Sequence, residues 1–282
     1  MNFTGEQKKS LAVLQLPCSA TLASEIHEEL IYLSAFNMCL SITAVLGNIL
    51  ILIALRKVSS LHSPSKLLFR CLATTDLCVG LITEPVTVVY WMSMTHAQWK
   101  LCRYALVSSV IAGYILSSVS LLTTSAISVD RLLALLLGLR YRQVVTLKRT
   151  YVIVVIFWIM SAVTSVLYLL NHPLISIWYC YILIPLCLVT SIASYTKIFL
   201  KLRHHQSQAQ GHFQQEQPSQ PVPLNIERYR KAVSSALWVQ CTLVACYLPY
   251  GIVGTLVSNS KTSPASFHIF NVAVTLVFLN SS

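Results

Sequence analysis

Seven long apolar segments divide the sequence, and they constrain the fold more than any other feature. A helix needs about 20 apolar residues to cross the hydrocarbon layer of a membrane. Since that layer offers no water to satisfy free backbone groups, each segment is predicted to be a helix. We therefore expect an all-α, integral membrane, seven-transmembrane helix bundle whose seventh helix is incomplete. The segments cover residues 30–55, 67–93, 103–132, 150–170, 174–200, 232–257 and 266–282.

The composition agrees with a chain that is surrounded by lipid. Of its 282 residues, 55% are hydrophobic and only 10% are charged, whereas soluble domains carry about 25% charged residues. The net charge of +11, taken alone, would suggest nucleic acid as a partner. However, the basic residues lie in short clusters between apolar runs and form no single basic stripe. The expected surroundings are the lipid bilayer, with no nucleic acid.

The positions of Lys and Arg predict how the bundle is oriented. Cytoplasmic loops carry an excess of these residues, and most of them flank one set of segment ends. We therefore expect residues 1–29 to be an extracellular tail and the chain to be a multi-pass protein of the plasma membrane. Asn2-Phe3-Thr4 is an acceptor sequon, so Asn2 is a candidate for glycosylation. Loops 56–66, 133–149 and 201–231 would be cytoplasmic, the last of them flexible because it is rich in Gln, His and Pro.

Ionisable residues inside the spans are candidates for function because burying them in a membrane is costly. Asp76 lies in the middle of its segment and could be a cation site or a protonated, hydrogen-bonded carboxyl. Asp130-Arg131 could be a functional pair or an ordinary ion pair at a helix end. Glu84, which precedes Pro85, could contact a ligand or lie at the membrane interface beside a kink.

These residues stand in fragments that resemble the rhodopsin-like (class A) G-protein-coupled receptors, and the resemblance covers nearly the whole chain. Leu72-Ala73-Thr74-Thr75-Asp76 looks like the family's LAxxD motif, and Asp130-Arg131-Leu132 looks like its D-R-Y motif. The other fragments follow in the family's order. They are Gly47-Asn48, Leu61-His62-Ser63-Pro64, Trp99, Leu139-Arg140-Tyr141, Trp158, Pro185, Cys246-Tyr247-Leu248-Pro249 and Asn280-Ser281.

The resemblance implies a mechanism and a set of residues for it. A ligand among the outer halves of the helices shifts the balance between two packings and opens a cleft for a heterotrimeric G protein. Asp130 would hold Arg131 at rest, and Leu139 would enter the G-protein surface. The other switch residues implied are Tyr195, Tyr247 and Pro249. Tyr247 replaces the family's tryptophan, so the coupling could differ.

The resemblance also implies an allosteric sodium site, and no other cofactor is expected. Oxygen ligands suit a hard cation, and sodium would favour the resting packing. The residues that match this pocket are Asn48, Asp76, Ser120, Asn280 and Ser281.

The ligand itself is only loosely defined by the sequence. Gly113 and Tyr114 stand where amine receptors of this family have a carboxylate, so we expect a largely neutral small-molecule or peptide ligand. The segment 266–282 contains no lysine, which argues against an opsin. The short loop near Asn171-His172-Pro173, between the fourth and fifth segments, is similar to that of the group holding melanocortin, cannabinoid, adenosine and lysophospholipid receptors. The candidate ligand pocket consists of Glu84, Gly113, Tyr114, Ser117, Ser118, Tyr247 and Tyr250.

A disulfide is expected at the outer side, which is an oxidising environment. Cys102 lies one turn before the position of the family's cysteine. Its possible partners are Cys180 and Cys18, and pairing with Cys180 is preferred.

The function predicted from these features is transduction of an extracellular signal to a G protein. No HExxH, GxSxG or GxGD motif is present, so an enzyme is not expected, and no internal repeat suggests a transporter. Because the sequence ends before the N-P-x-x-Y motif, the alternative is a truncated, non-signalling, receptor-like protein that modulates partners.

Overall fold

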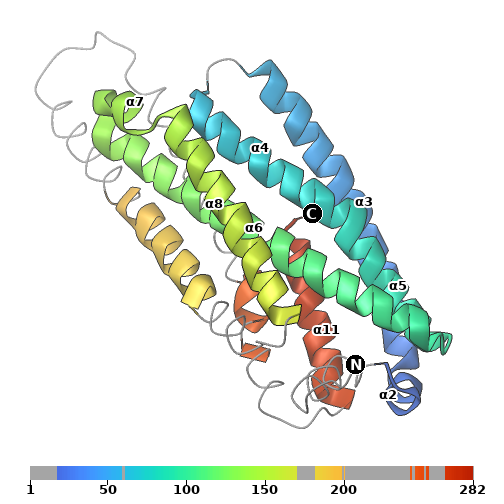
Figure 1. Ribbon diagram of the computed structural model, residues 1–282. Helices are drawn as coiled ribbons and strands as arrows, with labels where there is room; N and C mark the ends of the chain where they lie inside the picture. Colours follow the sequence, from blue (N-terminus) through green and yellow to red (C-terminus); the bar gives the residue numbers. More distant parts are fainter. Residues whose placement is uncertain are drawn as a thin grey trace, which may run out of the picture.

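The computed structural model describes residues 18–58, 61–169, 182–198, 200, 242, 245–250, 252–253 and 264–281. Four helices in this part are long and apolar enough to cross a membrane. They are α3 (His27–Lys57), the continuous helix formed by α4 (Ser63–Cys78), η1 (Val79–Thr83) and α5 (Glu84–Thr95), α6 (Trp99–Leu137) and α8 (Leu147–Leu169). Figure 1 shows them running side by side.

Shorter apolar helices complete the described bundle. They are Ile182–Ile198, which belongs to the fifth predicted segment, the residues 245–250 of the sixth, and α11 (Pro264–Leu279) of the seventh. The described residues contain no strand. The sequence predictions for Asn2, Cys180, the loop 201–231 and most of 232–257 lie outside the described residues.

The helix surfaces have the polarity of a membrane protein. Large apolar side chains such as Leu50, Ile159 and Val189 are more than half exposed, while hydroxyl and amide side chains are buried between the helices. Asn37, Thr75, Ser128 and Ser161 are completely buried. Small and polar residues at helix contacts are typical of bundles in lipid, because lipid already surrounds the apolar side chains.

The second span contains a π-helical turn, η1, that is held by α3. A π turn displaces backbone carbonyls from the regular helical ladder. The Ser41 hydroxyl donates to the Gly80 carbonyl at 2.7 Å, and the Asn37 amide donates to the Glu84 carbonyl at 3.1 Å. A side chain on Gly80 would lie only 3.0 Å from Cβ of Ala44. Glycine therefore allows α3 to approach the π turn closely enough for these bonds.

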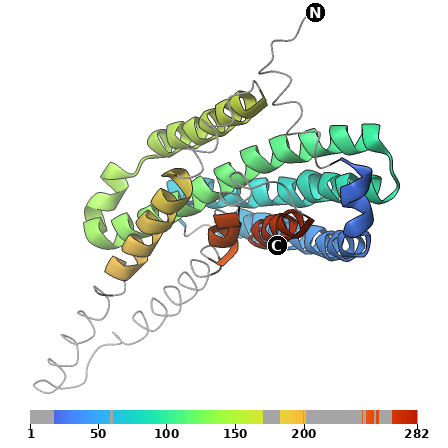
Figure 2. The ribbon, with the colours of Figure 1, turned by 90° about the horizontal axis from the view of Figure 1, so that it is seen from below.

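A short helix covers the bundle at the end where Cys102 lies, called here the Cys102 end. This helix, α2 (Ala20–Glu25), lies across the ends of α3 and α5 (Figure 2). Leu22, Ala23 and Ile26 are buried against Trp91 and other residues of the same apolar cluster. Burial of these side chains explains why residues 20–29, assigned to the tail from sequence, are almost entirely helical.

The predicted pairing of Cys102 with Cys180 is wrong, because Cys102 is bonded to Cys18. Packing of α2 on the bundle brings the two Cα atoms to 6.1 Å, a separation that a disulfide can bridge. Cys102 is completely buried and Cys18 nearly so. The bond fastens the start of the described chain to the first turn of α6.

Candidate functional site

Asp76 is the centre of a buried polar cluster that joins four helical segments. Its Oδ1 accepts a hydrogen bond from the Ser120 hydroxyl of α6 at 2.9 Å and one from the Ser281 hydroxyl at 3.0 Å. The Asn48 amide of α3 donates to the Ser281 carbonyl at 2.8 Å. The structure thus brings together four of the five residues predicted for the sodium pocket. The fifth, Asn280, precedes Ser281 in the turn that follows α11.

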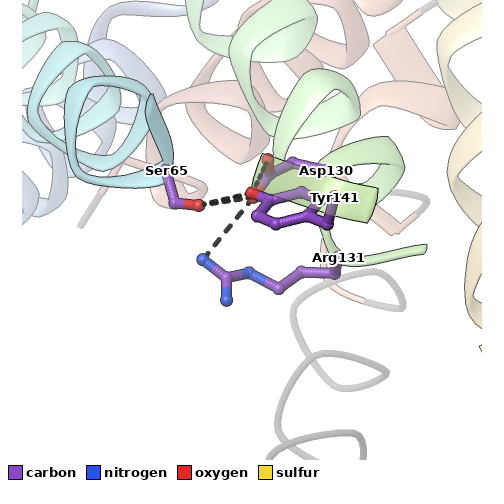
Figure 3. A network of polar contacts seen from close by, with 4 residues as sticks. All are labelled: Ser65, Asp130, Arg131 and Tyr141. Atoms are coloured by element: carbon purple, nitrogen blue, oxygen red, sulfur yellow. Dashed lines mark hydrogen bonds and ion pairs between the residues drawn. The ribbon is translucent and has the colours of Figure 1, made fainter. Parts of the chain in front are cut away.

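A second polar cluster surrounds Asp130 (Figure 3). It lies at the end of the bundle opposite the Cys102 end, called here the Asp130 end. The Tyr141 hydroxyl donates to Asp130 Oδ1 at 2.6 Å, and the Ser65 hydroxyl donates to Oδ2 at 2.8 Å. The two hydroxyl oxygens are 3.0 Å apart. Asp130 is therefore held by hydroxyl groups from α4 and from α7 (Tyr141–Val144).

Arg131 lies beside this cluster without a close bond to Asp130. Its Nη2 is 3.7 Å from Asp130 Oδ2, which is too long for a hydrogen bond. That nitrogen is buried and has no hydrogen-bond partner among the described residues. The guanidinium lies over the Phe69 ring, 5.3 Å from its centre, where a cation–π attraction is expected. Arg131 is therefore held by Coulomb attraction to Asp130 and by its contact with the Phe69 ring, and not by a charge-assisted hydrogen bond.

A glycine turn brings Tyr141 back to Asp130. Gly138 ends α6 with φ 50° and ψ −114°, a conformation that is essentially restricted to glycine. The chain then forms the 3₁₀ turn η2 (Gly138–Arg140) and α7. Tyr141 is 8% exposed, and its ring lies 5.2 Å from the ring of His62. Sequence reasoning noticed Tyr141 only as part of a loop fragment and missed its contact with Asp130.

The remaining switch residues are placed as follows. Tyr195, on the helix Ile182–Ile198, is buried against Leu132 and Leu135 of α6. Tyr247 is buried within the helical residues 245–250, which also contain Pro249. Leu139 belongs to η2, and its side chain lies outside the described part of the structure.

The residues predicted to bind the ligand come from facing helices nearer the Cys102 end. The Tyr247 hydroxyl donates to the Ser117 carbonyl of α6 at 3.4 Å, which is a long hydrogen bond. The rings of Tyr250 and Phe270 are 5.8 Å apart and link the sixth segment to α11. Ser118 is buried, while Gly113 and Tyr114 are half-buried on the same helix.

One interpretation of the sequence placed Glu84 at the membrane interface, and the structure differs from that interpretation. Its side chain is completely buried. Neither carboxylate oxygen has a hydrogen-bond partner in the described part of the chain. Two turns beyond it in α5, Trp91 donates to Oδ1 of Asn271 in α11 at 3.2 Å. This link between the second span and α11 was not recognised from sequence.

Comparison with known proteins agrees with these clusters. Residues 47–174, which contain Asp76 and the whole Asp130 cluster, match the family model described as "7 transmembrane receptor (rhodopsin family)". The chain is 30% identical over 190 residues to "Melanocortin receptor 4" of Danio rerio, a match that covers 65% of this chain and 57% of that relative. The chain thus spans little more than half the length of this relative.

The family match and the apolar spans together confirm the all-helical, membrane-spanning fold class predicted from the sequence. The disulfide predicted for this chain is also present, although with a different partner for Cys102. Over residues 47–174, the chain is similar to the rhodopsin family of seven-transmembrane receptors.

Proposed function

We propose that the chain transduces binding of an extracellular ligand into activation of a heterotrimeric G protein at the plasma membrane, with its N-terminus outside. The observation that carries this proposal is the Asp130 cluster. A buried arginine nitrogen without a hydrogen bond is energetically costly, and the 3.7 Å separation leaves Arg131 weakly bound to Asp130. A modest change in helix packing is therefore sufficient to release Arg131 toward a partner protein.

The ligand side of the proposal rests on contacts between α6 and the sixth segment. Tyr247 reaches the Ser117 carbonyl, so a ligand that displaces this long bond would change how the two helices pack. Such a ligand acts by binding one packing better than the other. Between Trp99 and Val129, α6 contains no carboxylate, which favours a largely neutral ligand over an amine.

Glu84 adds a requirement to this ligand. Its buried carboxylate oxygens accept no hydrogen bond from the described residues, and an unsatisfied buried acceptor is costly. A ligand that extends to Glu84 would gain most from a hydrogen-bond donor at that point. Since the relative named above is a melanocortin receptor, melanocortins are the first ligands to test.

The sodium site is also proposed. Asp76, Ser120 and Ser281 present one carboxylate and two hydroxyl oxygens within a single hydrogen-bonded cluster, and oxygen donors of this kind suit a hard cation. The described residues contain no group of three His, Cys, Asp or Glu side chains that could hold a transition metal. Sodium would link α4 to the end of α11 and favour that packing.

The test measures nucleotide exchange by purified G proteins on membranes that contain the chain. A library of neutral ligands and melanocortins is applied to the wild type and to Arg131→Ala. We expect exchange in response to at least one ligand and its loss in Arg131→Ala. Arg103→Ala, which removes an exposed cation near the Cys102 end, is the matched control and should respond like the wild type.

An Arg131→Ala protein that responds fully at equal surface expression would remove Arg131 from the mechanism. The orientation is tested separately, with tags placed before Leu30 and within the Gln-rich stretch 204–223. We expect these tags on opposite sides of the plasma membrane, and the same side for both would contradict the proposed orientation.

A further inference from the structure

Arg70 is an exposed cation on the lipid-facing side of the second span. It lies on α4 and is exposed, whereas Leu68, Thr75 and Asp76 are buried on the opposite side of the same helix. Arg70 is the seventh residue after Ser63, where α4 begins, which corresponds to about 10 Å along a helix. Arg70 is therefore set back from the end of the span, at the side of the bundle.

No carboxylate within the described residues is available to balance this charge. A cation on the lipid-facing side of a span is costly unless it finds a partner. Asp130 is the only described carboxylate near the Asp130 end, and it is 5% exposed and occupied by Ser65 and Tyr141. A partner for Arg70 has to come from outside the described part of the chain.

Two helices that pack against α4 also carry exposed cations at one end. Both α3 and α8 pack against α4. Arg56 and Lys57 lie in the last turn of α3, and Lys148 and Arg149 lie in the first turn of α8. All four are exposed. One guanidinium nitrogen of Arg149 donates to the Val144 carbonyl at 2.7 Å, which holds its charged group near the start of α8.

We propose that this surface, the Arg70 face (Arg56, Lys57, Arg70, Lys148 and Arg149), binds the phosphate-bearing head group of an anionic phospholipid. Basic pockets between spans attract such head groups, and the planar arginine fork matches phosphate oxygens in pairs. A soluble protein would have to reach about 10 Å down the side of the bundle to contact Arg70, where a lipid already lies. The leaflet is the cytoplasmic one if the orientation proposed above is correct.

The test measures lipid retention by native mass spectrometry after the purified chain is equilibrated in mixed micelles. The micelles contain phosphatidylcholine together with either phosphatidylserine or a bisphosphorylated phosphatidylinositol. We expect the wild type to retain the anionic lipids over phosphatidylcholine, most strongly the bisphosphorylated one. Since each basic residue near a membrane surface contributes about 1 kcal/mol, Arg70→Gln should reduce retention about fivefold.

Two variants make the result specific. Arg103→Gln removes an equal charge from an exposed position near the Cys102 end and should retain lipid like the wild type. Replacing both Lys148 and Arg149 with Gln should reduce retention more than Arg70→Gln does. Unchanged retention in Arg70→Gln, or an equal loss in Arg103→Gln, would overturn the proposal. Because no G protein is present, either result leaves the proposed receptor activity untouched.

Discussion

The hydroxyl of Tyr141 donates a hydrogen bond of 2.6 Å to Oδ1 of Asp130. Burial and this bond raise the pKa of Tyr141 to about 12. The hydroxyl is therefore protonated at any physiological pH and always able to donate. Asp130 thus has a permanent neutral partner in α7, which explains how it stays buried while Arg131 remains 3.7 Å away.

Tyr141→Phe should lower the free energy of unfolding by about 1–3 kcal/mol, because it leaves a buried carboxylate oxygen without its donor. Phenylalanine keeps the ring that contacts His62, so the change isolates the hydroxyl. Thermal unfolding of the purified chain measures the effect. In an Asp130→Asn background the same substitution should cost clearly less, since the two residues interact directly. An equal cost in both backgrounds would show that the bond contributes nothing.

Gly138→Ala should also destabilise the Asp130 end, although no atom lies within 4 Å of the added Cβ. The reason is the backbone, since φ 50° with ψ −114° costs a non-glycine residue about 1–3 kcal/mol. Gly113→Ala is the matched control. Its Cβ would meet only the Thr83 methyl at 3.8 Å, and alanine is favoured in a helix. A Gly138→Ala protein that melts no lower than the Gly113→Ala protein would contradict this account.

Gly80→Ala tests the close approach of α3 to the π turn. The new methyl group would lie 3.0 Å from Ala44 Cβ and 3.1 Å from the Ser41 carbonyl oxygen. Overpacking of this kind costs about 1–3 kcal/mol and should weaken the bond between Ser41 and the Gly80 carbonyl. We expect a lower melting temperature and lower surface expression. Adding Ala44→Gly removes the nearest atom and should restore part of the loss; no recovery in the double variant would argue against a clash at this contact.

The Asp76 cluster could be anticipated because Asp76 is an ionisable residue in an otherwise apolar span and because the family resemblance implied the other members. An ionisable residue in a span has to find partners within the bundle, and the resemblance to the rhodopsin-like receptors implied which polar residues those partners are. The hydrogen bonds of Asp76 with Ser120 and Ser281 agree with that expectation. Their distances, and the contribution of the Ser281 carbonyl, required the structure.

The Asp130 cluster and the π turn could not be anticipated in the same way. Tyr141 reaches Asp130 only because Gly138 adopts a positive φ, and no periodic pattern signals that turn. A π turn contains one residue more than an α-helical turn, and the apolar periodicity of a sequence is too coarse to show that difference. The choice of Cys18 over Cys180 depends on the path of α2 across the bundle, which the tail sequence alone does not define.

Cys18→Ser should destabilise the Cys102 end and release a thiol. The two cysteines are 84 residues apart in sequence, and closing a loop of that size contributes at most about 4–5 kcal/mol in the chain-entropy description. We expect a lower melting temperature in Cys18→Ser and a similar one in Cys102→Ser. The paired substitution should add little, because one bond is lost in each case. Clearly additive losses, or a Cys180→Ser protein with the same loss, would instead favour a bond between Cys102 and Cys180.

Asp76→Asn tests whether the central cluster binds sodium. If it does, sodium chloride should raise the melting temperature of the wild type more than potassium or choline chloride at equal ionic strength, because a ligand that binds only the folded state stabilises it. Asparagine keeps an oxygen that can accept from Ser120 and Ser281 but removes the charge that attracts a cation. The sodium-specific shift should therefore disappear in Asp76→Asn and persist in Arg131→Ala. A wild type that melts equally in all three salts would show that Asp76 joins α4, α6 and the end of α11 through hydrogen bonds alone.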